Sequence, residues 1–428
     1  MEKRSAFPVV FWVANFIEVL ERFAYYGIYM GFGIYMNYLG YTRDQLGIIQ
    51  GIFLLVSYVT PIFSGTFADR YGFKKVLIIS YIAYLPSILL LILTKSFSGI
   101  ALTMLSIGLA AGIFKPLISG TVRAVTDNTN KTLGFGLFYM MVNIGASFGP
   151  LVAGKLRAIS WNYAFFAAAA GIFFMLLITI FFYKEPERKL EGETLRKKFT
   201  DMSEALSDIK FTVFLIILGI FFWMPFWSFF NILPLYIETV LDTAQLYRAM
   251  DGILWHPILN FISEPDANGV RHILGETISH TGWLIIFFQI LVTKTSQKYN
   301  AMLTFMAGIF IAAIGYFFIG FANIASPSWV FLGIFLFAIG EMTSSPRIQE
   351  YITWIAPKEK AGLYMGCNFL ATGLGGSISG IYTWLFGHFQ TIEKPEYIWY
   401  VFSAHAILGI ICIYLFTKFV GEFEELKE

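Results

Sequence analysis

Residues 65–75 read GTFADRYGFKK, a short charged stretch between two long apolar segments. The apolar segments cover residues 44–67 and 75–94, and each is long enough to cross a bilayer as a helix. Two glycines in the stretch, Gly65 and Gly72, permit a tight turn and a close approach of the flanking helices. The stretch therefore predicts two membrane helices joined by a short charged turn.

The composition extends this prediction to the whole chain. Of 428 residues, 57% are hydrophobic and 14% are charged, whereas soluble domains carry about 25% charged residues. The spans have the length of helices rather than of barrel strands, so we expect an all-α integral membrane protein. A net charge of +2 is too small to indicate a nucleic-acid partner. The two cysteines, Cys367 and Cys412, lie in apolar segments, form no disulfide or metal-binding pattern, and are expected to fill the core.

Twelve apolar spans can be counted, and their even number places both termini on one side of the membrane. The loops on that side carry most of the lysines and arginines, which by the positive-inside rule makes it the cytoplasmic side. The first span has no small-residue cleavage site after it, so we expect it to be an uncleaved helix. The spans cover residues 8–37, 44–67, 75–94, 98–122, 133–154, 161–183, 211–240, 278–293, 301–322, 327–355, 362–387 and 397–417.

The longest charged linker divides the spans into two sets of six. The sequence thus predicts an N-terminal six-helix bundle over residues 1–183, a cytoplasmic linker over 184–210 and a C-terminal six-helix bundle over 211–428. An insert over residues 242–277 is expected on the outer side. It holds Trp255, His256 and His272, with His280 just beyond it. We expect an ordered extracellular cap; a zinc site is the alternative, although the histidine spacings match no known ligand pattern.

The stretch 65–75 resembles the signature loop of the major facilitator superfamily, G-x-x-x-D-R-x-G-x-K/R-K/R. The positions that fit are Gly65, Asp69, Arg70, Gly72, Lys74 and Lys75. The corresponding stretch of the second half, residues 292–301, has lost most of this pattern. The resemblance implies the major facilitator fold, with twelve transmembrane helices in two six-helix bundles that rock about a central site. It makes the matched residues a conformational gate, in which Asp69 can cap a helix end and accept an arginine.

A second charged stretch, FIEVLERFAYYG at residues 16–27, lies inside the first span. On a helix, Glu18, Glu21 and Arg22 fall within an arc of about 100°, and Tyr25 and Tyr29 continue the same stripe. One charge at the bilayer centre costs about 2.5–3.5 kcal/mol on insertion scales. The three charges should therefore face a water-filled or protein-lined interior and pair with one another.

Two further charges lie in other spans, Lys115 in the fourth and Glu341 in the tenth. Together with Glu18, Glu21 and Arg22 they leave one carboxylate without a cationic partner. An unpaired buried carboxylate tends to take up a proton, so we expect one of the three acids to bind a coupling proton. Arg347 and Glu350, three residues apart, should satisfy each other, and a cytoplasmic gate pair is the sharper hypothesis.

These pieces resemble one family within the superfamily, the proton-dependent oligopeptide transporters. Residues 18–27 match its first-helix pattern E-x-x-E-R-F-x-Y-Y-G at every fixed position. Residues 138–147 resemble its F-Y-x-x-I-N-x-G-S pattern, and residues 114–116 match its lysine–proline step. Residues 340–362 resemble its G-E-x-x-x-S-P … A-P-x-x-x-x-G segment. The resemblance makes Glu18, Glu21, Arg22, Lys115 and Glu341 the proton-coupling residues, and it places Tyr25, Tyr26, Tyr58, Lys115 and Asn143 in the substrate pocket.

Departures from the family concern the peptide-binding side chains. A second arginine usual on the first helix is Tyr29 here, and a pocket tryptophan on the eleventh helix is Asn368. The seventh span offers Trp223 and Trp227 in place of the family's acid. Tyr29, Asn368 and the two tryptophans are therefore further candidate binding residues. The proton-binding residues are kept, whereas the pocket becomes more aromatic and less charged.

The sequence thus indicates a proton-coupled symporter of di- or tripeptides or of a related small polar solute. It would be a multi-pass protein of the cell (inner) membrane with both termini cytoplasmic, working as a monomer, without a cofactor other than the coupling proton and without a nucleic-acid partner. The alternatives are a symporter for an amino acid, nitrate or organic acid, a proton-coupled antiporter that exports hydrophobic drugs, and a non-transporting sensor or scaffold. An enzyme is not expected, since no nucleophile–base pair, nucleotide loop or cofactor motif is present.

Overall fold

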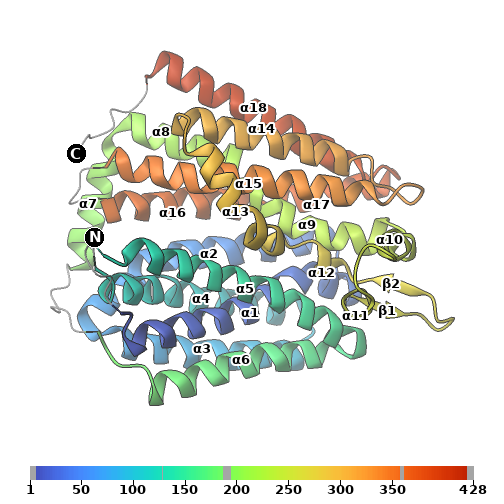
Figure 1. The fold of residues 1–428 in the computed structure, drawn as a ribbon, viewed down its shortest axis with the longest axis horizontal. Helices are drawn as coiled ribbons and strands as arrows, with labels where there is room; N and C mark the ends of the chain where they lie inside the picture. Colours follow the sequence, from blue (N-terminus) through green and yellow to red (C-terminus); the bar gives the residue numbers. More distant parts are fainter. Residues whose placement is uncertain (1–5, 128, 187–193, 357–360, 422–428) are drawn as a thin grey trace. The chain divides into compact units, whose positions relative to one another are not determined.

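The computed structural model describes residues 6–127, 129–186, 194–356 and 361–421. The two chain ends, residues 187–193 of the predicted linker and residues 357–360 of the segment 340–362 lie outside the described residues. Helices make up nearly all of the described chain (Figure 1). By its internal contacts the chain divides into two compact units, residues 1–39 with 52–195 and residues 40–51 with 196–428.

The first unit is built from long apolar helices. Helix α1 packs against α5 and α6, and α3 packs against α4 and α6. Prolines inside α2, α3, α4 and α5 are tolerated, as is usual in membrane helices, where neighbouring groups satisfy the freed backbone. The helices are α1 (Val9–Tyr38), α2 (Arg43–Tyr71), α3 (Phe73–Leu93), α4 (Phe97–Ala124), α5 (Lys131–Ile159) and α6 (Trp161–Phe181).

Glycines on α5 allow α1 to approach closely. A Cβ atom on Gly145 would lie 2.3 Å from the carbonyl oxygen of Val19 and 2.7 Å from the Cβ of Arg22. A Cβ atom on Gly149 would lie 2.3 Å from the carbonyl oxygen of Phe23. Glycines spaced four apart permit such backbone contact between membrane helices. The contact fixes the part of α1 that carries the charged residues.

The second unit holds the remaining helices and a small insert. Its membrane-length segment from Ile209 to Val240 contains a π-helical turn between two α-helices. Helix α14 packs against α15 and α18. The elements are α7 (Leu195–Ser207), α8 (Ile209–Leu218), η1 (Gly219–Trp223), α9 (Met224–Val240), α10 (Thr243–Met250), α11 (His256–Phe261), β1 (Ser263–Pro265), β2 (Arg271–Ile273), α12 (Gly275–Ile278), α13 (Gly282–Ser296), α14 (Ala301–Ile319), α15 (Trp329–Trp354), α16 (Ala361–Ile378), α17 (Gly380–Thr391) and α18 (Tyr397–Phe419).

The first turns of α2 group with the second unit, whereas the rest of α2 belongs to the first. A Cβ atom on Gly47 would lie 2.6 Å from the carbonyl oxygen of Gly380 on α17, so the two backbones are in contact. Two hydrogen bonds reinforce this contact. Thr383 donates to Gln50 at 2.8 Å, and Arg43 donates to Gln390 at 2.8 Å.

Among the described residues, nine helices are long and apolar enough to cross a membrane. The other three predicted spans are helical as well, as α1, as α13 and as the pair α16 and α17, which breaks at Ser379. The all-α architecture predicted from the sequence is therefore confirmed. The predicted turn over residues 65–75 is wrong in its extent, because α2 stays helical to Tyr71 and Gly72 alone, at φ +92°, separates it from α3.

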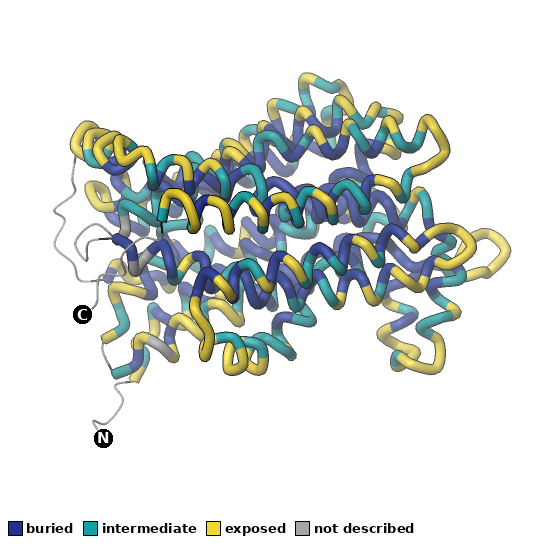
Figure 2. Tube along the Cα trace, turned by 90° about the horizontal axis from the view of Figure 1, so that it is seen from above, coloured by how far each residue is buried: buried dark blue, intermediate teal, exposed yellow. Residues whose placement is uncertain are grey.

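The insert over residues 242–277 is ordered. It comprises α10, α11, the β1–β2 hairpin and α12, which lie together near one end of α9 in Figure 1. Asp242 caps α10 by accepting from the amides of Ala244 and Gln245. Figure 2 shows exposed and buried stretches alternating along the chain. Large apolar side chains of the long helices, such as Ile82 and Phe287, are among the exposed residues.

Candidate functional site

The charged residues of α1 form one buried cluster. Arg22 donates through Nε to Glu18 at 2.8 Å, and its Nη2 lies 2.9 Å from an oxygen of Glu21. Glu18 is 3% exposed, Glu21 0% and Arg22 7%, so the ion pairs are shielded from solvent. The mutual pairing predicted from the 18–22 spacing is confirmed. Removing one charge from a buried ion pair of this kind leaves the other charge buried without a partner, which is strongly destabilising.

Helix α3 contributes a further contact to this cluster. The hydroxyl of Tyr84, which is fully buried, donates to the second oxygen of Glu21 at 3.5 Å. Glu21 is thus held from two sides, by the guanidinium on its own helix and by a phenol on the neighbouring helix. Both contacts place a donor group against the buried carboxylate of Glu21.

Lys115 on α4 is held by α2 rather than by the acids. Its ammonium donates to the hydroxyl of Ser57 at 2.8 Å and to the Ser57 carbonyl at 3.3 Å. The same nitrogen lies 3.8 Å from the centre of the Tyr58 ring and 5.2 Å from that of Tyr25, both cation–π distances. Within the described residues no ion pair reaches Lys115. Its charge is therefore stabilised by dipoles and rings and is not neutralised by a carboxylate.

The remaining candidate residues of the first unit are brought together in part. Tyr25, Tyr29 and Phe53 form a ring cluster with centroids 5.5–5.8 Å apart, and Tyr26 meets Tyr25 edge-on at 5.1 Å. Asn143, predicted to line the pocket, donates its amide to the Tyr139 carbonyl of its own helix at 2.9 Å.

The charge balance identifies the surplus carboxylate. In the first unit, the two negative charges of Glu18 and Glu21 equal in number the positive charges of Arg22 and Lys115, although only Arg22 is in ion-pair contact with them. Glu341 belongs to the second unit, where its carboxylate accepts from the Thr281 hydroxyl at 2.8 Å, and no ion pair joins it to a described residue. Glu341 also borders a small cavity of about 20 Å³ lined mainly by apolar side chains, several of them aromatic. Of the three acids considered from the sequence, Glu341 is the one without a cationic neighbour.

The second unit presents an aromatic wall on α9 and the π-helical turn η1. Trp223 and Trp227, 6% and 3% exposed, flank Phe226, whose ring lies 5.5 and 5.3 Å from theirs. Asn368 on α16 is also buried, and its side-chain oxygen accepts no hydrogen bond from the described residues. π-Helical turns are rare and often mark functional positions. The wall contains no acid, in agreement with the sequence.

The turn at Gly72 between α2 and α3 is stabilised by a residue that was not predicted from the sequence. Glu185, just after α6, accepts from the amides of Phe73 and Lys74 at 2.7 and 2.8 Å and so caps α3. The ammonium of Lys74 donates to the Ile180 carbonyl at 2.9 Å. The carboxylate of Glu185 therefore caps α3, and the capping role expected of Asp69 stays a prediction. Gly65, Asp69 and Arg70 are helical residues of α2, and Lys75 is exposed near the start of α3.

The predicted pair of Arg347 and Glu350 is present in α15. Arg347 lies 2.5 Å from the Glu350 carboxylate and donates to the Tyr299 carbonyl at 2.6 Å. The second contact ties α15 to the segment before α14. The pairing is confirmed, and its action as a gate stays a prediction.

The histidines of the insert bind protein groups separately. His256 lies 3.6 Å from Asp251, and His272 lies 3.6 Å from Asp266 and 2.9 Å from the Thr243 hydroxyl. His280 accepts from the Gly282 amide at 2.9 Å. Across the described ranges, no three His, Cys, Asp or Glu side chains converge as a metal site would require. The pKa of Asp266 is lowered, chiefly by the hydrogen bond from the Val270 amide.

Four contributors were missed from the sequence: Ser57, Tyr84, Glu185 and Thr281. Each acts through a contact across helices. Ser57 directly precedes the selected Tyr58 in the sequence, and this position could have suggested a contact with the same neighbour, Lys115. The other three show no pattern in the sequence that links them to Glu21, Phe73 or Glu341.

Comparisons with known proteins agree with this architecture. The quinolone resistance protein NorA of Staphylococcus aureus (strain COL) is 24% identical over 361 residues, which cover 82% of this chain and 84% of that protein. A Na(+), Li(+), K(+)/H(+) antiporter of Planococcus maritimus is 22% identical over 401 residues, covering 84% and 89%.

Solved structures give the same fold at low sequence identity. A POT family transporter in complex with 5-aminolevulinic acid superimposes with a TM-score of 0.75 at 21% identity, covering 96% of each chain. The nucleoside transporter NupG superimposes with a TM-score of 0.76 at 11% identity, covering 95% of this chain and 99% of that one. The family model described as "Major Facilitator Superfamily" matches residues 11–263 and 269–425 of this chain. The chain therefore belongs to the major facilitator superfamily.

Proposed function

We propose that the protein is a proton-coupled secondary transporter that imports a small solute by alternating access. The observation that carries the proposal is the buried cluster of Glu18, Glu21 and Arg22 beside an ammonium, Lys115, that no described carboxylate neutralises. Ionisable groups at membrane depth are costly and are usually retained for ion or proton pathways. A scaffold or sensor would have no need of them.

Each charged group has a distinct task in this proposal. A proton on Glu18 or Glu21 removes one of the two negative charges that hold Arg22. Lys115, stabilised by Ser57 and Tyr58, is available to attract a carboxylate of the substrate. Such binding can drive the cycle only if proton and substrate favour one conformation over the other. Glu341, without a cationic neighbour, is the candidate for a second proton-binding group in the other unit.

The substrate class follows from the groups that are present and from those that are replaced. In the first unit, Lys115 favours a solute with a carboxylate. In the second unit, taken by itself, the wall of Trp223, Phe226 and Trp227 favours a solute with an apolar part. Several superimposing structures are of peptide transporters, and one is of a POT family transporter in complex with 5-aminolevulinic acid. We therefore propose a di- or tripeptide, or a related amino or organic acid. We further propose a monomer in the cell membrane with both termini cytoplasmic.

A second candidate function is proton-coupled export of hydrophobic compounds. It is favoured by the aromatic wall without an acid and by the similarity to a quinolone resistance protein and to a cation/proton antiporter. In this case the proton would enter while the solute leaves. The same acidic cluster would serve, so only the direction and the solute distinguish the two candidates.

Proteoliposomes with a pH-sensitive dye inside provide the test. Di- and tripeptides, then amino acids and organic acids, are added outside, and acidification of the lumen is followed. A fluoroquinolone loaded inside, with an imposed pH gradient, tests export. Glu21→Gln is run alongside, with Glu204→Gln on α7 as a matched control, because Glu204 is an exposed acid outside the cluster.

The outcomes separate the candidates. Solute-driven acidification in the wild type and in Glu204→Gln, but not in Glu21→Gln, supports the symporter. Export of the quinolone that stops when the gradient is collapsed supports the antiporter instead. Solute-driven acidification that Glu21→Gln leaves unchanged would refute the role given to the cluster.

A further inference from the structure

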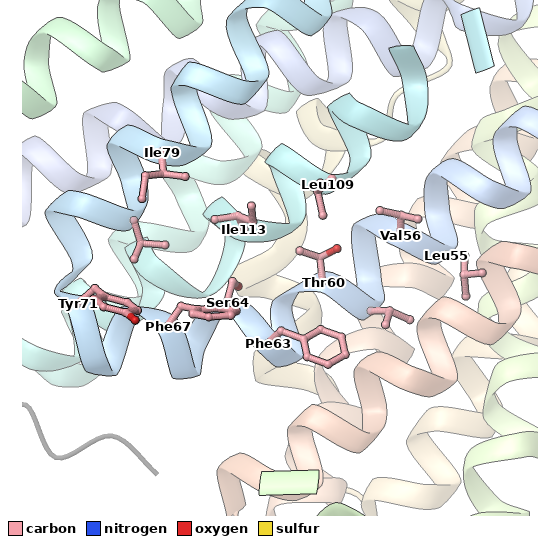
Figure 3. Close-up of a pocket in the computed structure, with 12 residues that line it drawn as sticks. Leu55, Val56, Thr60, Phe63, Ser64, Phe67, Tyr71, Ile79, Leu109 and Ile113 are labelled. Carbon is pink, nitrogen blue, oxygen red and sulfur yellow. The ribbon is translucent and has the colours of Figure 1, made fainter. Parts of the chain in front are cut away.

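An apolar groove on the first unit takes no part in the charged site. It has a volume of about 820 Å³ and is formed by α2, α3 and α4 (Figure 3). Leu55, Phe63 and Phe67 of α2 line it on one side, and Ile79, Leu109 and Ile113 of α3 and α4 on the other. Neither Tyr58 nor Lys115 lines it. The volume lies within the range of about 300–1,000 Å³ that is usual for ligand pockets.

The lining has almost nothing to offer a polar ligand. No charged residue lines the groove, and its polar side chains are Thr60, Ser64 and Tyr71. The Ser64 hydroxyl already donates to the carbonyls of Pro61 and Gly112, each at 3.4 Å. A polar solute entering here would give up hydrogen bonds to water without replacement. The groove is therefore suited to hydrocarbon.

The groove also has the length of a lipid chain. From Leu55 to Tyr71 the helix rises about 24 Å at 1.5 Å per residue. One leaflet of the hydrocarbon core is about 15 Å deep, half of the usual thickness. Leu55, Phe67, Ile79 and Leu109 are each 40–58% exposed in the structure, so bilayer lipid can reach them. One acyl chain fits along the groove, and the lipid headgroup could then lie at the Tyr71 end or at the Leu55 end.

The charged side chains next to the groove indicate at which end the lipid headgroup lies. At its Tyr71 end, the Arg70 guanidinium lies 5.4 Å from the centre of the Tyr71 ring, and Lys75 adjoins Val76 of the lining. Arg70 and Lys75 are both exposed. The nearby Glu185 is engaged by the amides of Phe73 and Lys74, and Asp69 is the other acid of this turn. Basic side chains at a membrane surface attract anionic headgroups, and a tyrosine is favoured at the same depth.

We propose that this groove binds one anionic phospholipid, with an acyl chain along α2 and α4 and the phosphate beside Arg70 and Lys75. The lipid would belong to the leaflet that adjoins the α2–α3 turn. It would cover apolar side chains that otherwise meet bulk lipid. This site does not depend on the proposed transport function.

Native mass spectrometry of the protein released from nanodiscs tests the proposal. The nanodiscs contain equal amounts of phosphatidylglycerol and phosphatidylcholine with identical chains. Ile113→Trp fills the groove, and Ile82→Trp is the matched control, because Ile82 is an exposed α3 residue that does not line the groove. Lys75→Gln removes a basic side chain at the surface and leaves the groove open.

We expect the wild type and Ile82→Trp to retain one phosphatidylglycerol in preference to phosphatidylcholine, and Ile113→Trp to lose it. Lys75→Gln should lower the preference about fivefold, the change expected from one basic residue near an anionic headgroup. Because Lys75 is exposed, this result stays informative even if Ile113→Trp fails to fold. Equal retention of both lipids by the wild type, or an unchanged preference in Lys75→Gln, would overturn the proposal. So would a hydrophobic transport substrate that displaces the bound lipid and is then carried across the membrane.

Discussion

Replacing Arg22 with glutamine should destabilise the protein more than replacing either of its carboxylate partners. Arg22 is the only basic residue in ion-pair contact with Glu18 and Glu21 among the described residues, at 2.8 and 2.9 Å. Arg22→Gln leaves two carboxylates at 3% and 0% exposure without their counter-ion. Glu18→Gln or Glu21→Gln, in contrast, leaves the guanidinium with one carboxylate.

The expected magnitudes follow from these contacts. Removing one partner of a buried ion pair costs about 3–5 kcal/mol, and this is the loss we expect for Arg22→Gln. Losing a single hydrogen bond to a charged group costs about 1.5–3 kcal/mol, the range expected for each carboxylate variant. Lowering the pH should narrow the difference, because protonating a carboxylate removes the buried charge that Arg22 no longer neutralises.

Unfolding by dodecyl sulfate in mild detergent, followed by circular dichroism, measures these free energies. Each variant is compared with the wild type at pH 7.5 and at pH 5, in the same micelles. If Arg22→Gln unfolds no more readily than Glu21→Gln, or if its deficit does not shrink at the lower pH, the account of the cluster as a charge-balanced unit is refuted.

Three further predictions concern the groups that position the site. Gly145→Ala should cost about 1–3 kcal/mol of unfolding free energy, since its Cβ would lie 2.3 Å from the Val19 carbonyl; Gly136→Ala, which has open space, is the control and should be neutral in the same titration. Ser57→Ala should weaken solute binding several-fold in uptake assays, because Lys115 loses its 2.8 Å hydroxyl partner; a variant with wild-type affinity would contradict this. Glu185→Gln should destabilise the start of α3 by about 0.3–1 kcal/mol, seen as faster hydrogen exchange at its first amides, and unchanged exchange would exclude the cap.

The fold was largely predictable because its determinants are local. Runs of apolar residues gave the spans, and the spacing of Glu18, Glu21 and Arg22 gave their shared face and their pairing. The end of the second span was placed too early, at residue 67, whereas α2 continues to Tyr71.

The contacts across helices were not predictable in the same way. The hydroxyl of Tyr84 reaches Glu21 only because α3 packs where it does, and Glu185 caps α3 from more than a hundred positions away. The π-helical turn that ends at Trp223 is likewise packed closely against α16, where a Cβ on Gly375 would lie 2.4 Å from the Gly219 carbonyl oxygen. Such contacts require the three-dimensional arrangement of the helices.

The division of α2 between the two units has a mechanical consequence. Gln50 accepts a hydrogen bond from Thr383, whereas Ser57, seven residues further along the same helix, accepts one from Lys115. An unbroken helix is stiff over the roughly 10 Å that separate these positions along its axis. A displacement of the first turns of α2 along the helix axis would therefore also move Ser57, the hydroxyl and carbonyl partner of the Lys115 ammonium.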